Sequence, residues 1–214
     1  MATRELSDLQ FIKVLEGYQQ PYFTVADVKK ILSIEGKSIY VTIHRLIKNG
    51  VLLKVNRGIF QVESQTNQIE QTANQLYYPS YVSFESALAH YGILSQQPYA
   101  VSFATTQKSK NLTLSQQKII FHQLKTGYFF GFVLQAGRYI AEPEKAVLDQ
   151  LYLISRGQAI DETAEWSLMN MDQSKFLEYA KKFPLSVQLK TQQLLKNWKS
   201  YAVTNENQSR IMAT

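Results

Sequence analysis

The chain has 214 residues, of which 45% are hydrophobic and 19% charged, and its formal net charge is +6. This composition is that of a folded globular protein and excludes a disordered chain, a collagen and a coiled coil. The absence of cysteine excludes disulfide scaffolds, thiol nucleophiles and cysteine-ligated zinc or iron–sulfur sites, whereas the positive charge makes nucleic acid a candidate partner.

The start of the chain predicts a cytoplasmic protein. Its first residues include Arg4, Glu5, Asp8 and Lys13, and they lack the apolar segment of a secretory signal. The longest uncharged stretch, residues 86–107, is interrupted by polar side chains and a proline. We therefore expect no membrane span and no membrane partner.

Two N-cap patterns mark the first two helices. Ser7 followed by Gln10, and Thr24 followed by Asp27, are spaced so that each pair can form a capping box at the start of a helix. The helices expected after these caps are residues 8–16 and 25–32.

A third helix is predicted over residues 37–48, because apolar side chains recur there at helical spacing. The residues of this apolar face are Ile39, Ile43, Leu46 and Ile47. Two extended runs follow, residues 51–55 and 59–63, and Asn56-Arg57-Gly58 joins them. Asparagine and glycine tolerate positive φ, so this connection favours a hairpin.

The order helix, helix, glycine turn, helix, hairpin is that of a winged helix-turn-helix, which we predict for a DNA-binding domain over residues 1–66. No aspartate or glutamate lies between Lys37 and Arg57. The polar face of the third helix is therefore expected to enter a DNA major groove, with the hairpin contacting the DNA beside it. The alternative is a three-helix core whose polar face is only solvated. The candidate DNA-binding residues are Lys37, Ser38, Val41, Thr42, Arg45, Lys48, Asn56 and Arg57.

Residues 67–75, rich in glutamine and asparagine, are interpreted as a linker, with a solvated helix as the alternative. A larger, mixed α/β domain is expected over residues 76–203, and a polar tail over residues 204–214, so the predicted fold class is α+β. The helices expected in the second domain are 84–91, one beginning at Pro143 and ending before Gly157, 173–182 and 186–199. The extended runs are 99–105, 118–122, 128–134 and 139–140.

Two features of the second domain have competing interpretations. The aromatic run from Tyr128 to Phe132 is either a buried strand or a platform on which bases stack. A second basic run, without acidic residues, is either a surface for an RNA, a nucleotide or an acidic protein partner, or a set of solvated strand edges. Its residues are Lys108, Lys110, Lys118, Lys125 and Arg138.

The usual sequence signatures of enzymes are missing. There is no phosphate-binding glycine loop, no zinc-protease motif, no nucleophile elbow and no cluster of carboxylates that would hold the two metal ions of a nucleotidyltransferase. The three histidines, His44, His90 and His122, are far apart in sequence. We therefore expect no catalytic residues, no metal and no other cofactor.

Three segments, taken in order after the N-terminal domain, resemble the AbiEi-type antitoxins of abortive-infection, type IV toxin–antitoxin systems. They are Tyr81-Val82-Ser83-Phe84-Glu85-Ser86-Ala87-Leu88, Thr105-Thr106-Gln107-Lys108-Ser109-Lys110, and Tyr139-Ile140-Ala141-Glu142-Pro143-Glu144-Lys145-Ala146-Val147-Leu148-Asp149. One departure is Glu142, where the family more often has serine or another small cap.

The resemblance implies two activities. The N-terminal domain would repress its own operon by binding inverted repeats in the promoter, and the second basic run would belong to an antitoxin surface that counteracts a nucleotidyltransferase toxin, directly or indirectly. Two other functions stay open. One is a winged-helix regulator whose second domain senses a small ligand, and the other is a nucleic-acid-modifying enzyme.

Overall fold

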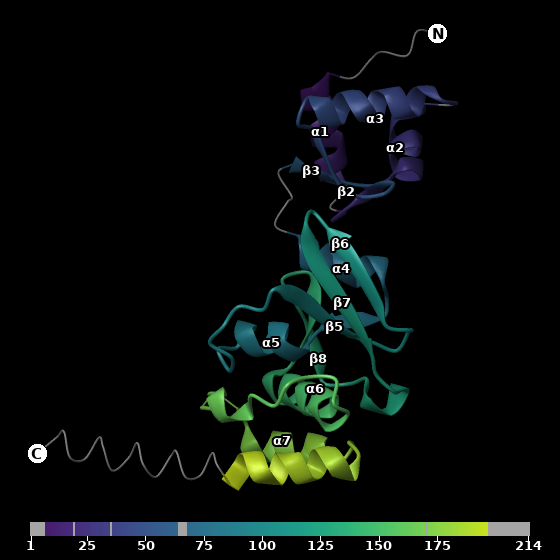
Figure 1. Cartoon of the computed structure of the whole chain (residues 1–214). Helices are drawn as coiled ribbons and strands as arrows, with labels where there is room; N and C mark the ends of the chain where they lie inside the picture. The colour runs from purple at the N-terminus through teal and green to yellow at the C-terminus, as the bar shows by residue number, and fades with distance from the viewer. Residues whose placement is uncertain (1–6, 19, 35, 64–67, 170, 197–214) are drawn as a thin grey trace, which may run out of the picture. The chain divides into compact units, whose positions relative to one another are not determined.

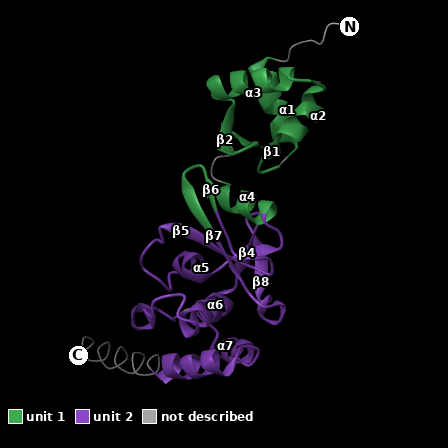
Figure 2. Cartoon of the chain, turned by 45° about the vertical axis from the view of Figure 1, so that its right-hand side comes forward, with its two compact units in different colours: residues 1–76, 112–119 green, residues 77–111, 120–214 purple. Residues whose placement is uncertain are grey.

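The computed structural model describes residues 7–18, 20–34, 36–63, 68–169 and 171–196. Two compact units divide the chain (Figure 2). Unit 1 comprises Met1–Leu76 and Leu112–Ile119, and unit 2 comprises Tyr77–Asn111 and Ile120–Thr214. The described strands form two sheets, and helices accompany both, so the fold is of the mixed α+β class that the sequence predicts. The predicted tail, residues 204–214, lies outside the described residues.

The first two helices of unit 1 begin at the predicted capping boxes. The Ser7 amide donates to the side chain of Gln10 at 3.0 Å, and the Thr24 amide donates to the carboxylate of Asp27 at 2.8 Å. The Ser7 and Thr24 hydroxyls accept in return from the backbone amides of their partners. These bonds satisfy N–H groups that a helix start leaves unpaired, and so they fix where each helix begins. The helices of this part are α1 (Asp8–Gly17), α2 (Val25–Leu32) and α3 (Ser38–Lys48).

A glycine-dependent cap ends α3. Gly50 has a φ of 70°, and the amide of Val51 reaches back to the carbonyl of Leu46 at 2.9 Å, as in a Schellman motif. The side chain of Asn49 donates to the carboxylate of Asp8 at 2.7 Å. This bond ties the end of α3 to the start of α1.

A three-stranded antiparallel sheet of order β1-β3-β2 completes the fold of this part of unit 1. The predicted hairpin is confirmed as β2 and β3, with Leu52 opposite Val62. Strand β1 was not predicted, because two residues are too short to show an alternating pattern. The strands are β1 (Phe23–Thr24), β2 (Leu52–Asn56) and β3 (Ile59–Val62).

The core of unit 1 is apolar and draws on all of these elements. The predicted buried face of α3 contributes Ile39, Ile43 and Leu46. The other core residues are Phe11, Leu15, Phe23, Val28, Val51, Leu52, Phe60 and Val62. Since these side chains hold the inner face of α3, its opposite face is left to solvent.

The segment predicted as a linker contains a packed helix, α4 (Ile69–Leu76), so the linker interpretation of residues 67–75 is corrected. The buried amide of Gln61 donates to the hydroxyl of Thr72 and to the carbonyl of Pro21, both at 2.8 Å. Ala73 is also buried. The glutamine-rich composition suggested a spacer because its few inward-facing residues are small or polar. Helix α4 belongs to unit 1, so the division between the units falls after Leu76.

A six-stranded sheet of order β6-β7-β5-β4-β9-β8 organises the second part of the chain (Figure 1). Strand β4 pairs antiparallel with β5 and parallel with β9. The tip of the β6–β7 hairpin, residues 112–119, is grouped with unit 1. Strands β4 and β6 were not predicted. The strands are β4 (Ser80–Val82), β5 (Ala100–Thr105), β6 (Lys110–Leu114), β7 (Gln117–Gln123), β8 (Phe132–Gln135) and β9 (Arg138–Ala141).

Helices α5 and α6 pack together, α5 also against β5, and α7 packs on α6 (Figure 1). Pro143 opens α6, as predicted, and nearly every residue of α6 is buried. Residues 185–196 are also helical. Within the described ranges, no helix has both the length and the apolarity needed to span a membrane. The helices are α5 (Phe84–His90), α6 (Pro143–Ser155) and α7 (Gln173–Ala180), with single turns at Thr126–Tyr128 and Thr163–Glu165.

Candidate nucleic-acid interface

The outward face of α3 carries most of the predicted DNA-binding residues. Ser38, Val41, Arg45 and Lys48 are exposed, and their spacing of three, four and three residues places them along one stripe of the helix. Lys37, at the N-cap, is exposed as well. The stripe lies opposite the buried apolar face, so its side chains are available to a partner.

Two apolar side chains stand out on this helix. Val41 is 73% exposed and Tyr40 is 63% exposed. An exposed valine in the middle of a helix gains nothing from burial in the fold and has a low helix propensity. Tyr40 is not among the candidates named from the sequence; helical spacing places it at the border of the buried face.

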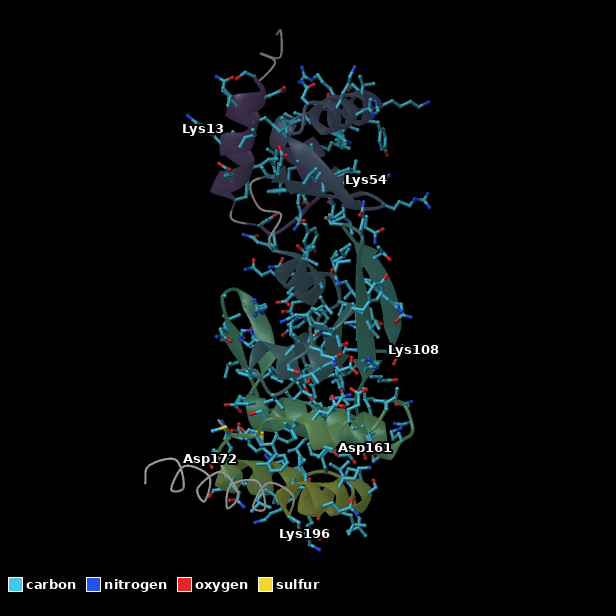
Figure 3. The ribbon with its side chains drawn as sticks, turned by 60° about the vertical axis from the view of Figure 1, so that its left-hand side comes forward. Lys13, Lys54, Lys108, Asp161, Asp172 and Lys196 are labelled. Atoms are coloured by element: carbon cyan, nitrogen blue, oxygen red, sulfur yellow. The ribbon has the colours of Figure 1, made fainter. Side chains whose placement is uncertain are left out.

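Cations dominate the surface from α3 to the hairpin. Arg45, Lys48, Lys54 and Arg57 are all exposed, and Lys54 is labelled on β2 in Figure 3. Among the described residues, none of these four side chains forms an ion pair with a carboxylate. The sequence from Lys37 to Arg57 holds no acidic residue. These four cations are therefore not held in ion pairs within the described residues.

The turn of the β2–β3 hairpin is held by Asn56. Its side-chain amide donates to the carbonyl of Thr113 at 3.2 Å, and its side-chain oxygen accepts from the amide of Arg57 at 2.6 Å. The amide of Ser115 donates to the carbonyl of Val55 at 3.2 Å. Asn56 is thus occupied in holding the turn, and Arg57 is the exposed cation at its tip.

Thr42 presents less of its polar group than the sequence suggests. Its hydroxyl donates to the carbonyl of Ser38, one turn earlier in α3, at 3.2 Å. The side chain is half-buried. With the hydroxyl engaged by the helix itself, the group that Thr42 offers outward is its methyl group.

The second basic run does not gather into one patch. Lys118 is grouped with unit 1, whereas Lys108, Lys110, Lys125 and Arg138 belong to unit 2. Lys110 lies on β6 and Arg138 on β9, four strand spacings apart in the sheet order, which corresponds to about 19 Å. Lys108 and Lys110 remain neighbours (Figure 3 labels Lys108), and the Lys110 ammonium lies 4.9 Å from the ring centre of Tyr77.

A buried polar cluster in unit 2 escaped the sequence analysis. The Lys145 ammonium pairs with the Asp149 carboxylate, and the Tyr81 hydroxyl donates to Asp149 at 3.0 Å while it accepts from Lys145 at 2.8 Å. The Ser83 hydroxyl donates to Asp149 at 2.7 Å. All four side chains are buried, so in this structure the cluster fixes α6 against β4.

Burial dominates the electrostatics of this polar cluster. It lowers the pKa of Lys145 and raises the pKa of Asp149, while the attraction between the two charges opposes both shifts. Burial and the neighbouring Asp149 carboxylate raise the pKa of Tyr81 well above 10.0. Tyr81 therefore stays a neutral hydroxyl that donates to Asp149.

Aromatic rings surround the ammonium of the polar cluster. The Lys145 nitrogen lies 5.3 Å from the ring centre of Tyr81 and 5.2 Å from those of Phe130 and Phe183.

The prediction of a strand from Tyr128 is wrong for its first residues: residues 126–128 form a single helical turn, and the strand begins at Phe132. Gly131, at a φ of 68°, lies so close to Tyr179 and Lys145 that a larger residue would clash, and this turn interrupts the strand.

Glu142 forms a bridge to α7 rather than a cap on α6. Its carboxylate accepts from the Lys175 ammonium at 2.6 Å and from the Tyr179 hydroxyl at 2.7 Å, and it makes no capping hydrogen bond. Burial acts to raise the pKa of Glu142, but these two hydrogen bonds outweigh it, and the pKa lies below its ordinary value. Glu142 therefore connects the start of α6 to α7.

Neither the residue constellations nor the comparisons with known proteins add a site of another kind. In the part of the chain that the structure describes, no three histidine, aspartate or glutamate side chains gather in a way that could hold a metal ion. No protein-family model matches the chain, and no curated protein matches it either.

Proposed function

We propose that unit 1 is a winged helix-turn-helix that binds double-stranded DNA and represses transcription. The observation that carries the proposal is the exposed stripe of α3, whose Arg45 and Lys48 form no ion pair within the described part of the chain, followed by a hairpin with Arg57 at its tip. Such a surface gains binding free energy on DNA, because each phosphate that a cation neutralises releases condensed counterions.

Protein–DNA interfaces combine contacts to bases with contacts to phosphates, and the arrangement of α3 and the hairpin can provide both. A helix fits the major groove, and side chains on its outward stripe reach base edges, while cations beside it contact phosphates. In this proposal Arg45 and Val41 face the bases, and Lys37, Lys48 and Arg57 contact the backbone. A C-terminal unit attached to such a module is typical of a regulator whose DNA binding is coupled to a second activity.

For unit 2 we propose the activity implied by the resemblance to AbiEi-type antitoxins, namely counteraction of a nucleotidyltransferase toxin. The proposal is supported by the contact, in the folded chain, between residues of two of the segments that carry the resemblance. Tyr81 and Ser83 come from one of the segments that carry the resemblance, Lys145 and Asp149 come from another, and the four side chains form one buried cluster. The operator would then be inverted repeats in the protein's own promoter.

The DNA-binding proposal is tested by a gel-shift titration of the full chain on the promoter region upstream of its own reading frame. Arg45→Ala removes a base contact, which we expect to cost about 1–3 kcal/mol of binding free energy. Lys13→Ala is the matched control, because Lys13 (labelled in Figure 3) is an exposed cation on α1, outside the proposed interface. Equal affinities for the wild type and both variants, with unchanged melting temperatures, would contradict the proposal.

A further inference from the structure

The side chains on the exposed face of α3 form an unusually restricted set. The helix contains no asparagine, glutamine, aspartate or glutamate. Asparagine and glutamine are the side chains that pair with both edge groups of adenine, and the acidic side chains accept from the amino group of cytosine. Helix α3 therefore lacks the amide and carboxylate side chains that make the characteristic contacts with adenine and cytosine in a major groove.

The groups that α3 does offer are suited to the other two bases. Arg45 is exposed and can donate two hydrogen bonds to the O6 and N7 acceptors of guanine. Val41, 73% exposed, offers only methyl groups, and the methyl group of Thr42 adds to them because its hydroxyl is bonded to Ser38. Apolar groups in a major groove contact the methyl group of thymine.

We infer that the α3 surface reads guanine through Arg45 and the thymine methyl group through Val41. The inference rests on the proposed DNA binding and names the bases that this binding distinguishes. Val41 and Arg45 are one helical turn apart, which is about 6 Å along the helix axis. Because base pairs are about 3.4 Å apart, the guanine and the thymine lie within about two base pairs of each other.

The inference explains the exposed valine. Val41 costs the folded protein helix propensity and, in the free protein, leaves its methyl groups in water. Burial of those groups against a thymine methyl group recovers the apolar free energy only when DNA with the right base is bound. The side chain then contributes to the choice of sequence rather than to general affinity, which the phosphate contacts supply.

The test uses the full chain and DNA with single atoms or groups removed. A pool of random-sequence duplexes is selected for binding, and the tightest duplex is resynthesised with deoxyuridine in place of each thymidine, one position at a time. Deoxyuridine lacks only the methyl group. We expect one thymidine in each bound half-site at which this change weakens binding about fourfold, the value of one buried methyl group. At a guanine within about two base pairs, 7-deazaguanine removes the N7 acceptor and weakens binding to a similar or larger extent.

Variants assign these effects to residues. Val41→Ala reduces the preference for thymidine over deoxyuridine, because the two valine methyl groups are lost and only the methyl groups of alanine and Thr42 remain. Val41→Thr, which keeps one of the two valine methyl groups, retains more of that preference. The control Val14→Ala removes a partly exposed valine from α1 and retains the full preference. If 7-deazaadenine weakens binding while no deoxyuridine does, or if the thymidine preference is undiminished in Val41→Ala, the inference is overturned although DNA binding stands. If no duplex is enriched over a random competitor, the proposed DNA binding itself fails.

Discussion

Single residues show that the charged side chains of this protein occur in two environments, exposed on a helix face and buried in an ion pair. Arg45 and Lys48 lie on an exposed face and form no ion pair with any carboxylate of the described residues, whereas Lys145 is fully buried with Asp149. An exposed cation keeps its charge available to a partner in solution. A buried pair loses hydration and must recover the cost from its own contacts. A cationic side chain is thus structural in unit 2, whereas in unit 1 we propose that it binds DNA.

Breaking the buried pair from one side should be far more costly than replacing both partners. Lys145→Met leaves the Asp149 carboxylate buried without its cation, and we expect a loss of about 3–5 kcal/mol in the free energy of unfolding. Lys145→Met with Asp149→Leu removes both charges and should recover much of that loss. Urea denaturation of the full chain measures both; a double variant less stable than either single variant would contradict this view of the pair.

Acid stability tests the bridge from Glu142 to α7. The pKa of Glu142 is lowered in the folded protein, so the bridge contributes stability above the ordinary value of 4.5, and this contribution is lost as the pH falls through the lowered folded pKa. Glu142→Gln should be less stable at neutral pH and lose less stability on acidification. The control is Glu178→Gln, an exposed change on α7 that leaves the bridge intact. Parallel pH profiles of Glu142→Gln and the wild type would exclude this role.

Elements that local sequence determines were predicted well. Capping boxes and helical spacing act over a few residues, and they predict α1, α2 and α3 nearly residue by residue. The two-residue β1 and three-residue β4 could not be predicted, because pairing rather than periodicity defines them. The same reason hid the polar cluster, since Tyr81 and Asp149 are 68 residues apart.

Helix α4 offers a test at the scale of elements. A fragment of residues 1–66 removes α4 and leaves the buried amide of Gln61 without Thr72, whereas a fragment of residues 1–76 keeps both. Loss of a buried partner costs about 1–3 kcal/mol, and lost apolar contacts add to it. We expect the longer fragment to show the higher urea midpoint. Equal midpoints would mean that α4 does not stabilise the core of unit 1.

At the scale of the whole molecule, the two proposed activities, DNA binding and antitoxin activity, should respond to different charges. Lys108→Glu with Lys110→Glu reverses two exposed charges of unit 2, and we expect impaired rescue of cells that express the cognate toxin, with nearly unchanged operator affinity. Charge attraction at such a surface acts over about 8 Å at physiological salt. Colony survival and an operator titration measure the two effects.

A matched double variant shows whether position matters. Lys181→Glu with Lys196→Glu makes the same charge change elsewhere in unit 2, at two other exposed lysines. Rescue should be retained by this control. Full rescue by a stably folded Lys108→Glu, Lys110→Glu protein would contradict this prediction and favour the alternative interpretation of the basic run as solvated strand edges.

The most direct test of the central claim, that the outward face of α3 binds DNA, is the salt dependence of binding. The logarithm of the association constant falls linearly with the logarithm of the salt concentration, with a slope set by the number of phosphate contacts. We predict that Lys48→Ala weakens binding on all sequences alike and reduces the slope by about one contact, whereas Lys13→Ala leaves it unchanged. Identical affinities and slopes for the wild type, Lys48→Ala and Arg57→Ala would contradict the account.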